Sequence, residues 1–234
     1  MTPETFTDAL AQFRQQCIAT QERFVLTNET IWPILNEDTS QTAFDRQYIY
    51  HPAWACRVLR RTNPPMHYDF SSTLNFMAMA SAWVPMTFCD YRPAPLQLDG
   101  LTTRGENLTQ LSFPDNSLDS VSCMHVLEHV GLGRYGDVLD YDGDLKAIAE
   151  LTRVVRAGGD LLIVLPLGRT ALIQFNAHRI YTWEGILEMF RERFDLVESA
   201  LIPEQANLGL VYSPDKTLLN EQNYACGCFW FKKR

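Results

Sequence analysis

From Met66 onward, short apolar segments alternate with segments of helical periodicity, and this alternation constrains the fold of the 234-residue chain most strongly. The pattern is typical of βαβ units, in which helices cover both faces of a mostly parallel sheet. We therefore expect a doubly wound α/β domain with seven strands. The expected strands are 66–70, 84–91, 100–107, the start of 117–130, 160–168, about 194–202 and 224–233, and the expected helices are 72–83, 142–159 and 182–193.

The first 60 residues lack this alternation of short apolar and helical segments, which predicts an N-terminal helical extension (1–60) before the α/β domain (61–234). Apolar residues spaced three to four apart predict a helix over 4–24. A second helix is expected to begin at Pro52, because proline is favoured in a first turn. The pair Gly158-Gly159 is expected to end the helix 142–159 as a left-handed cap.

The charge balance argues against nucleic acid as a partner. The chain has 20 Lys and Arg residues and 28 Asp and Glu residues, which gives a formal net charge of −8. The basic clusters Arg60-Arg61 and 232–234 are too short to offset this, so a small-molecule substrate is the better expectation. The sequence leaves the oligomeric state open.

The N-terminus has acids and glutamines where a secretory signal needs a basic start and an apolar stretch. The longest apolar run, 161–167, is too short to span a bilayer. Six cysteines are scattered without a Cys-x-x-Cys motif, so we expect no metal site, no disulfide framework and a cytoplasmic location. Cys226 and Cys228 are expected to pack in the core.

Two acids follow neighbouring strands of the predicted sheet. Asp69 ends the first strand and Asp90 ends the second, 21 residues later. Ligands of open α/β sheets bind outside the carboxyl ends of the strands, and an acid at this interval can accept hydrogen bonds from ribose hydroxyls. Acids at strand ends also form turns, so the spacing alone leaves both interpretations open.

Two passages resemble a known family. The sequence LSFPDNSLDSVSCMHVLEH (111–129) is similar to the "LPFPDNSFDVV…LEH" passage of the class I, Rossmann-like S-adenosylmethionine (SAM)-dependent methyltransferases. The sequence AELTRVVRAGGDLLIVLP (149–166) is similar to their "E…RVLKPGG…P" passage. The resemblance covers about residues 60–195, and the run 125–147 suggests a poorly characterised branch.

The resemblance implies SAM as cofactor and a small or medium-sized methyl acceptor. It places Asp90 on the ribose, Asn107 rather than Glu106 on adenine, and the end of the fourth strand beside the methionine part. The implied cofactor-binding residues are Asp69, Ser71, Ser72, Asp90, Tyr91, Asn107, Leu108, Cys123 and His125.

The first loop departs from the family pattern. Where the family usually has acid-x-Gly-x-Gly-x-Gly, this chain has Asp69-Phe70-Ser71-Ser72-Thr73-Leu74-Asn75, without any of the three glycines. A serine loop can still hold the methionine carboxylate or cap the next helix. The alternatives are a methyltransferase-like binding module without activity, or a nicotinamide-dinucleotide oxidoreductase, which the lost glycines disfavour more.

Methyl transfer depends mainly on proximity and orientation, so a base is needed only if the acceptor must lose a proton. His125 and His129 are the candidate bases, with Glu128 beside them, although histidines at this position also stabilise turns. The glycine-rich loop 131–141 is a candidate lid whose Arg134 or Tyr135 reaches the substrate. Its acids lack the spacing of a calcium loop, and Asp142 or Asp144 is expected to cap the following helix.

Overall fold

The structure is a computed structural model that describes residues 2–19 and 24–234. The chain divides into two compact units, Met1–Phe44 and Asp45–Arg234. The first contains helix α1 (Pro3–Ala19) and the single turn η1 (Asn28–Thr30), joined by a 2.6 Å hydrogen bond from Arg14 to Asn28. The helix predicted over 4–24 is confirmed to Ala19, and residues 20–23 lie outside the described residues.

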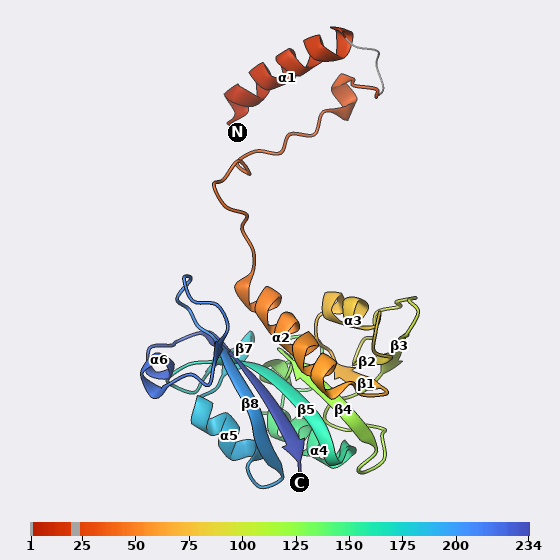
Figure 1. Ribbon diagram of the computed structural model, residues 1–234, viewed down its shortest axis with the longest axis vertical. Coiled ribbons are helices and arrows are strands. Elements are labelled where there is room, and N and C mark those ends of the chain that lie inside the picture. Colours follow the sequence, from red (N-terminus) through yellow and green to blue (C-terminus); the bar gives the residue numbers. More distant parts are fainter. Residues whose placement is uncertain (1, 20–23) are drawn as a thin grey trace. The chain divides into compact units, whose positions relative to one another are not determined.

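The second unit is built on one large sheet (Figure 1). Its order is β3-β2-β1-β4-β5-β10-β8-β9, parallel from β3 to β5, with β10 antiparallel to both of its neighbours and β9 antiparallel to β8. The strands are β1 (His67–Phe70), β2 (Met86–Asp90), β3 (Leu101–Gly105), β4 (Leu118–Met124), β5 (Val155–Leu167), β8 (Phe194–Ile202), β9 (Val211–Tyr212) and β10 (Ala225–Lys233). All seven predicted strands are confirmed, and the short β9 is an eighth.

Helices cover both faces of this sheet, which confirms the predicted α/β class (Figure 1). On one face α2 (Arg46–Thr62) and α3 (Leu74–Ala80) form a core with Trp54, Leu59 and Phe76. On the other, α4 (Gly143–Val154) and α5 (Trp183–Phe190) form a second core with Leu151 and Phe190. Burial of both faces explains why β5 is apolar along most of its length.

Two short features lie outside the predicted elements. Strands β6 (Leu172–Gln174) and β7 (His178–Ile180) form a separate hairpin, and helix α6 (Lys216–Asn220) lies in the connection before β10. Strands of three residues are too short to show an alternating pattern, so periodicity gave no signal for them.

The predicted start of the second helix is wrong. Helix α2 begins at Arg46, because the Asp45 side chain accepts a hydrogen bond from the Tyr48 amide at 3.1 Å and caps it. Pro52 therefore lies inside the helix and is buried. Helix α2 lies in the second of the two units, which begins at Asp45, and the domain boundary at residue 60 stays a prediction.

The predicted glycine cap of the helix before β5 is also wrong. Helix α4 ends at Val154 and the chain passes directly into β5, where Gly158 has a positive φ of 72° within the strand. The Lys233 ammonium of β10 satisfies carbonyl groups at this helix end, donating to Thr152 and Val155 at 2.6 Å each. A residue distant in sequence thus provides the expected capping interaction.

Residues 2–19 and 24–234 include no helix that is both long enough and apolar enough to cross a bilayer.

Candidate active site

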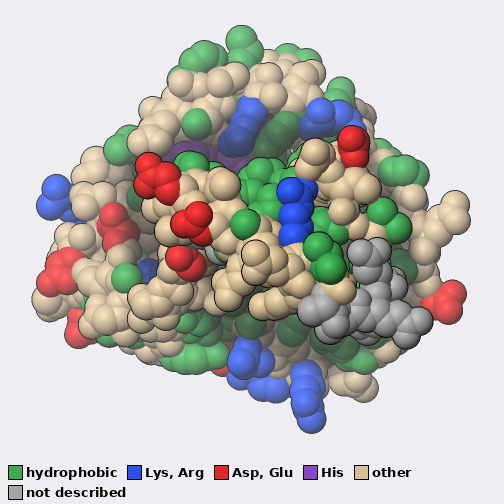
Figure 2. Space-filling view, turned by 90° about the horizontal axis from the view of Figure 1, so that it is seen from above, with side chains coloured by type: hydrophobic (Ala, Val, Ile, Leu, Met, Phe, Trp, Pro, Cys, Tyr) green, Lys and Arg blue, Asp and Glu red, His purple; other side chains and the backbone are tan. Residues whose placement is uncertain are grey.

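The sheet order reverses between β1 and β4, and two cavities lie at the carboxyl ends of these strands. Such a switch point is where open α/β sheets bind ligands. Figure 2 shows the molecule from above, with histidine side chains visible among hydrophobic ones. Cavity A has a volume of about 380 Å³, within the range of about 300–1,000 Å³ usual for small-molecule sites. Cavity B has a volume of about 630 Å³.

Most of the predicted cofactor residues line cavity A. It is bordered by Ser71, Asp90, Tyr91, Arg92, Glu106, Asn107, Leu108, Thr109, His125, Val126, His129, Val130, Gly131, Tyr135, Asp137, Val138, Asp140 and Gly143. Ser71, Asp90, Tyr91, Asn107, Leu108 and His125 are therefore brought together from four different strand ends. The remaining predicted residues lie elsewhere: Asp69 and Cys123 are fully buried, and Ser72 and Glu128 line cavity B.

Asp69 organises the chain beneath the cavities. Its carboxylate accepts a 2.9 Å hydrogen bond from the Ser72 amide and another from the Ser122 hydroxyl of β4. Burial raises the pKa of Asp69 to about 6, against the lowering effect of these hydrogen bonds. The acid thus fixes the loop after β1 to β4 and does not face the ligand space directly.

The serine loop that replaces the three glycines is held by its own hydrogen bonds. Ser71 has a positive φ of 60°, and its hydroxyl donates to the Cys89 carbonyl at 3.2 Å. The Ser72 hydroxyl accepts from the Met124 amide at 3.1 Å, and the Thr73 hydroxyl caps α3 through the Phe76 amide. The left-handed backbone at Ser71 is the conformation that glycine adopts most easily, at the position where the family has its first glycine.

Asp90 lies at the end of β2, and one of its two carboxylate oxygens is hydrogen-bonded within the protein. Its Oδ1 accepts from the Arg92 amide at 2.6 Å, while no donor among the described residues contacts Oδ2. A free carboxylate oxygen facing a cavity can accept from a ribose hydroxyl. Arg92 continues the wall by lying over the Tyr135 ring at 5.2 Å.

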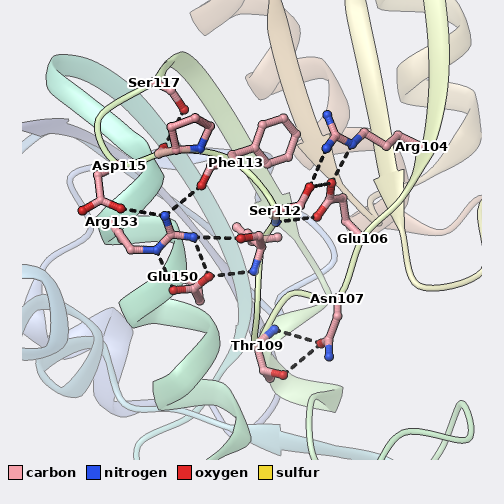
Figure 3. A network of polar contacts seen from close by, with 12 residues as sticks. Arg104, Glu106, Asn107, Thr109, Ser112, Phe113, Asp115, Ser117, Glu150 and Arg153 are labelled. Atoms are coloured by element: carbon pink, nitrogen blue, oxygen red, sulfur yellow. Dashed lines mark hydrogen bonds and ion pairs between the residues drawn. The ribbon is translucent and has the colours of Figure 1, made fainter.

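The chain after β3 forms the opposite wall of cavity A and is held by α4 (Figure 3). Arg153 donates to the carbonyl groups of Phe113 and Leu111 at 2.8 and 2.9 Å, and Glu150 accepts from the Leu111 amide at 2.6 Å. The two passages that carry the family resemblance therefore meet in space. No local pattern in the sequence indicates this contact, because Arg153 and Leu111 are 42 residues apart.

Asn107 and Glu106 differ in how the protein uses them (Figure 3). Buried Glu106 accepts from the Ser112 amide and hydroxyl at 3.0 and 2.6 Å, and pairs with Arg104. Asn107 is exposed, and its Oδ1 accepts from the amide and hydroxyl of Thr109. The Asn107 side-chain N–H groups, rather than the Glu106 carboxylate, are thus available to a ligand.

His125 uses both of its ring nitrogens within the protein. Nδ1 lies 2.9 Å from Glu128 Oε1, and Nε2 lies 3.3 Å from Cys226 Sγ. Burial lowers the pKa of His125, but Cys226 and the Glu128 carboxylate outweigh it and raise the pKa above its usual value. A histidine with both nitrogens engaged is poorly placed to remove a proton from a substrate.

His129 is better placed to act as a base, because it lines both cavities. Its Nδ1 donates to the Ala177 carbonyl at 2.7 Å, which leaves the lone pair on Nε2. Burial lowers the pKa of His129, so the imidazole is neutral at neutral pH. Glu128 Oε1 lies 3.8 Å from Nε2, where it can stabilise an imidazolium.

The candidate lid, 131–141, borders cavity A but is tied down in several places. The Asp137 carboxylate accepts from the amides of Gly131 and Gly133 at 2.8 and 3.3 Å. Arg179 of β7 donates to the Val130 and Tyr141 carbonyls at 2.6 and 2.9 Å. These bonds hold the loop in one conformation over the cavity.

The predicted acidic cap of α4 is wrong. Within the described chain, the Asp142 side chain makes no capping hydrogen bond although the residue occupies the cap position. Asp144 is buried in the first turn, where it accepts from the Tyr181 hydroxyl at 2.8 Å and lies near Arg179. Asp144 therefore interacts with Tyr181 and Arg179 and does not cap the helix.

The chain resembles known proteins in sequence over one segment and in structure over most of its length. Residues 107–212 match the family model "Caenorhabditis protein of unknown function, DUF268", and no curated protein matches the chain. The structure is similar to the 1,6-didemethyltoxoflavin-N1-methyltransferase of Burkholderia thailandensis with bound S-adenosylhomocysteine (SAH). The TM-score is 0.56 at 13% identity, over 100% of this chain and 91% of that one.

Two further solved structures show a similar degree of likeness. The N-methyltransferase NodS of Bradyrhizobium japonicum in complex with SAH has a TM-score of 0.55 at 13% identity, over 77% of this chain and 86% of that one. The [4+2]-cyclase SpnF has a TM-score of 0.53 at 13% identity, over 78% and 81%. Sequence identity this low shows the fold alone. The chain therefore has the class I, Rossmann-like fold of the SAM-dependent methyltransferases.

Proposed function

We propose that the protein is a SAM-dependent methyltransferase that acts on a small or medium-sized acceptor. The observation that carries the proposal is the meeting of Ser71, Asp90, Asn107 and His125 around cavity A. These residues come from the ends of β1, β2, β3 and β4, and a cavity of about 380 Å³ suits a nucleoside with a short side chain. The methyltransferase fold of the chain supports the same function.

The residues of cavity A fit SAM in their donor and acceptor chemistry. Asp90 Oδ2 is free to accept from the ribose hydroxyls, and the Asn107 amide is free to meet adenine. Ser71 and His125 border the space where the methionine part would lie. When bound, SAM supplies an activated methyl group on a sulfonium.

We assign the acceptor to cavity B, which shares Ser71, His125, His129 and Tyr135 with cavity A. An acceptor there would approach the cofactor across this shared boundary. The two cavities orient both partners for displacement, which is the main requirement of methyl transfer. For a hydroxyl or ammonium acceptor, His129 Nε2 accepts the proton and Glu128 stabilises the resulting charge.

A second candidate, a binding module without activity, is supported by the serine loop. Ser71 and Thr73 use their hydroxyls within the protein, so they offer less to the methionine carboxylate than a glycine loop offers through its backbone. The third possibility, a nicotinamide-dinucleotide oxidoreductase, needs the same glycines for a pyrophosphate.

Calorimetric titration with SAM, SAH and NAD⁺ in parallel separates these three functions. Micromolar binding of SAM and SAH without NAD⁺ is expected for the methyltransferase. Binding of NAD⁺ alone would favour the oxidoreductase, and the absence of binding by all three would favour the module. If SAM binds, release of SAH in the presence of candidate acceptors distinguishes an enzyme from a SAM-binding protein.

A further inference from the structure

Three side chains from distant parts of the chain meet beside cavity B. His51 lies on α2, His125 follows β4, and Cys226 begins β10. Each offers one potential metal-ligand atom, and these three atoms lie within 4.8 Å of one another. Their separation in the sequence explains why no metal-ligand spacing could be recognised there.

The free nitrogen of His51 is the first sign that this cluster is more than core packing. His51 is fully buried, and its Nδ1 lies 2.6 Å from the Gln47 carbonyl, to which it donates. Its Nε2 is buried without a hydrogen-bond partner among the described residues. A buried ring nitrogen with a lone pair and no donor is costly unless something occupies the space in front of it.

The hydrogen bonds behind the two histidines have the arrangement found at metal sites. Ligating histidines generally donate their second ring N–H to a carbonyl or carboxylate, which fixes the tautomer and directs the lone pair at the metal. His51 donates to the Gln47 carbonyl, and His125 Nδ1 lies 2.9 Å from Glu128 Oε1. His125 Nε2 therefore lies next to Cys226 Sγ, and His51 Nε2 is left without a partner among the described residues.

We propose that His51, His125 and Cys226 form a zinc site. Two imidazole nitrogens and one thiolate are a donor set that Zn²⁺ accepts, with a fourth position for water or another ligand. Tetrahedral zinc separates two nitrogens by about 3.3 Å and a nitrogen from a sulfur by about 3.6 Å. The 3.3 Å between His125 Nε2 and Cys226 Sγ is close to this N–S separation, and binding would draw in the three atoms, which lie within 4.8 Å of one another.

Binding exchanges two protons for the metal. The Cys226 thiol and the protonated His125 ring each lose one proton to solvent, and the thiolate and two neutral imidazoles bind Zn²⁺ without any redox change. The site would join α2 to the ends of β4 and β10 and fix the His125 ring, which lies at the boundary of cavities A and B. It does not depend on the proposed methyltransferase activity.

The test uses the full chain without a histidine tag, stripped of metal with a chelator, and no SAM. Titration with Co²⁺ is expected to give one equivalent of bound metal, a sulfur-to-cobalt charge-transfer band and the intense visible bands of tetrahedral Co²⁺. Zn²⁺ should abolish both signals, and competition with a chromogenic chelator gives its affinity. Absence of stoichiometric binding by the wild-type chain would overturn the proposal.

Cys226→Ser and His51→Gln assign the ligands, and Cys228→Ser is the matched control. Cys228 lies two residues further along β10, is equally buried and contacts the Cys226 thiol, but it is not one of the three proposed ligands. Cys226→Ser should lose the charge-transfer band, and both ligand variants should weaken Zn²⁺ binding by more than the roughly 10- to 100-fold cost of losing an outer-shell partner. An unchanged band or unchanged affinity in either variant would refute the assignment.

Thermal unfolding keeps the test decisive if one ligand variant folds poorly. Zn²⁺ should raise the melting temperature of the wild-type and Cys228→Ser chains, because a ligand that binds the folded state stabilises it. Zn²⁺ should not change the melting temperature of a ligand variant that still folds. Equal shifts in that variant and the wild type would show that the metal binds elsewhere.

Discussion

Arg153 Nη2 lies 2.9 Å from the carbonyl oxygen of Leu111, so α4 directly holds the chain that leaves β3 (Figure 3). The same guanidinium donates to the Phe113 carbonyl and pairs with Glu150 and Asp115. These contacts position the segment that begins at Asn107, where the proposed adenine contact lies. Arg153 and these contacts, which we call the Arg153 clamp, therefore hold one wall of cavity A.

We expect Arg153→Ala to lower the free energy of unfolding by about 2–4 kcal/mol, because it removes several hydrogen bonds to charged or carbonyl groups. It should also weaken SAH binding about tenfold by releasing the wall of cavity A. Arg153→Lys should recover little, since an ammonium cannot make the forked contacts. Urea denaturation and calorimetry measure the two effects.

Arg156→Ala is the control for this clamp. Arg156 lies close by at the start of β5, but it is half-exposed and pairs with Asp119 at the surface. Such pairs contribute less than about 1 kcal/mol, so this variant should unfold close to the wild type and bind SAH normally. A similar loss of stability in both variants would contradict the clamp.

The architecture could be predicted because it depends on local patterns. The apolar run of β5 and the alternation around it reflect burial by helices on both faces, and each predicted strand is present. The start of α2 could not be placed, because the capping effect of Asp45 outweighs the interruption expected at Pro52. The Lys233 cap of α4 depends on a contact between residues distant in sequence.

The candidate site could be predicted only in part. Asp90 and Asn107 border cavity A because strand ends in a parallel sheet meet at one edge, which spacing reveals. Whether a strand-end residue faces the cavity or the core depends on packing, so the burial of Asp69 and Cys123 was not visible. The meeting of His51 and Cys226 requires the tertiary fold, and no local motif signals it.

Asp90→Ala should abolish detectable SAM and SAH binding. The carboxylate is proposed to accept from the ribose hydroxyls, and each hydrogen bond to a charged group contributes about 1.5–3 kcal/mol. The loss of two such bonds should therefore lower the affinity for SAM and SAH roughly 100-fold or more. Calorimetric titration with SAH measures it directly.

Asp99→Ala is the matched control, because Asp99 is an exposed acid in the turn before β3 and is not part of the proposed site. It should bind SAH as the wild type does. Normal binding by Asp90→Ala would show that the ribose assignment is incorrect, even if SAM binds elsewhere in the cavity.

Replacement of Ser71 tests whether the serine loop is a functional substitute for glycine. Ser71→Gly removes the side chain from a position with positive φ, so the relief of strain should offset the lost hydroxyl contact and leave stability within about 1 kcal/mol. SAH affinity should be unchanged or higher. Ser71→Val should lose about 2 kcal/mol or more, because a β-branched residue tolerates this backbone poorly.

Urea denaturation and SAH titration of both Ser71 variants give the answer. A large loss of SAH affinity in Ser71→Gly would mean that the hydroxyl itself contacts the ligand. Wild-type stability in Ser71→Val would mean that the backbone at this position is not left-handed in solution.

His67 should make the stability of the protein depend on pH. Its imidazole is fully buried, with its nitrogens 2.8 Å from the Ser120 and Ser122 hydroxyls, and burial lowers the pKa of His67 to about 3. Between that value and the ordinary pKa of 6.5, the folded protein therefore binds fewer protons than the unfolded chain. Stability should be complete above about pH 6.5 and fall by about 1.4 kcal/mol per pH unit below it.

His67→Gln isolates this contribution, because an amide keeps a donor and an acceptor for the two serines but does not titrate. Free energies of unfolding are measured by urea denaturation from pH 5 to pH 8 for both proteins. Other buried groups that titrate here, such as Asp69, contribute to both curves and largely cancel in the difference. The variant should be less stable at pH 8 and converge on the wild type as the pH falls, whereas parallel curves would show that His67 is protonated equally in the folded and unfolded states.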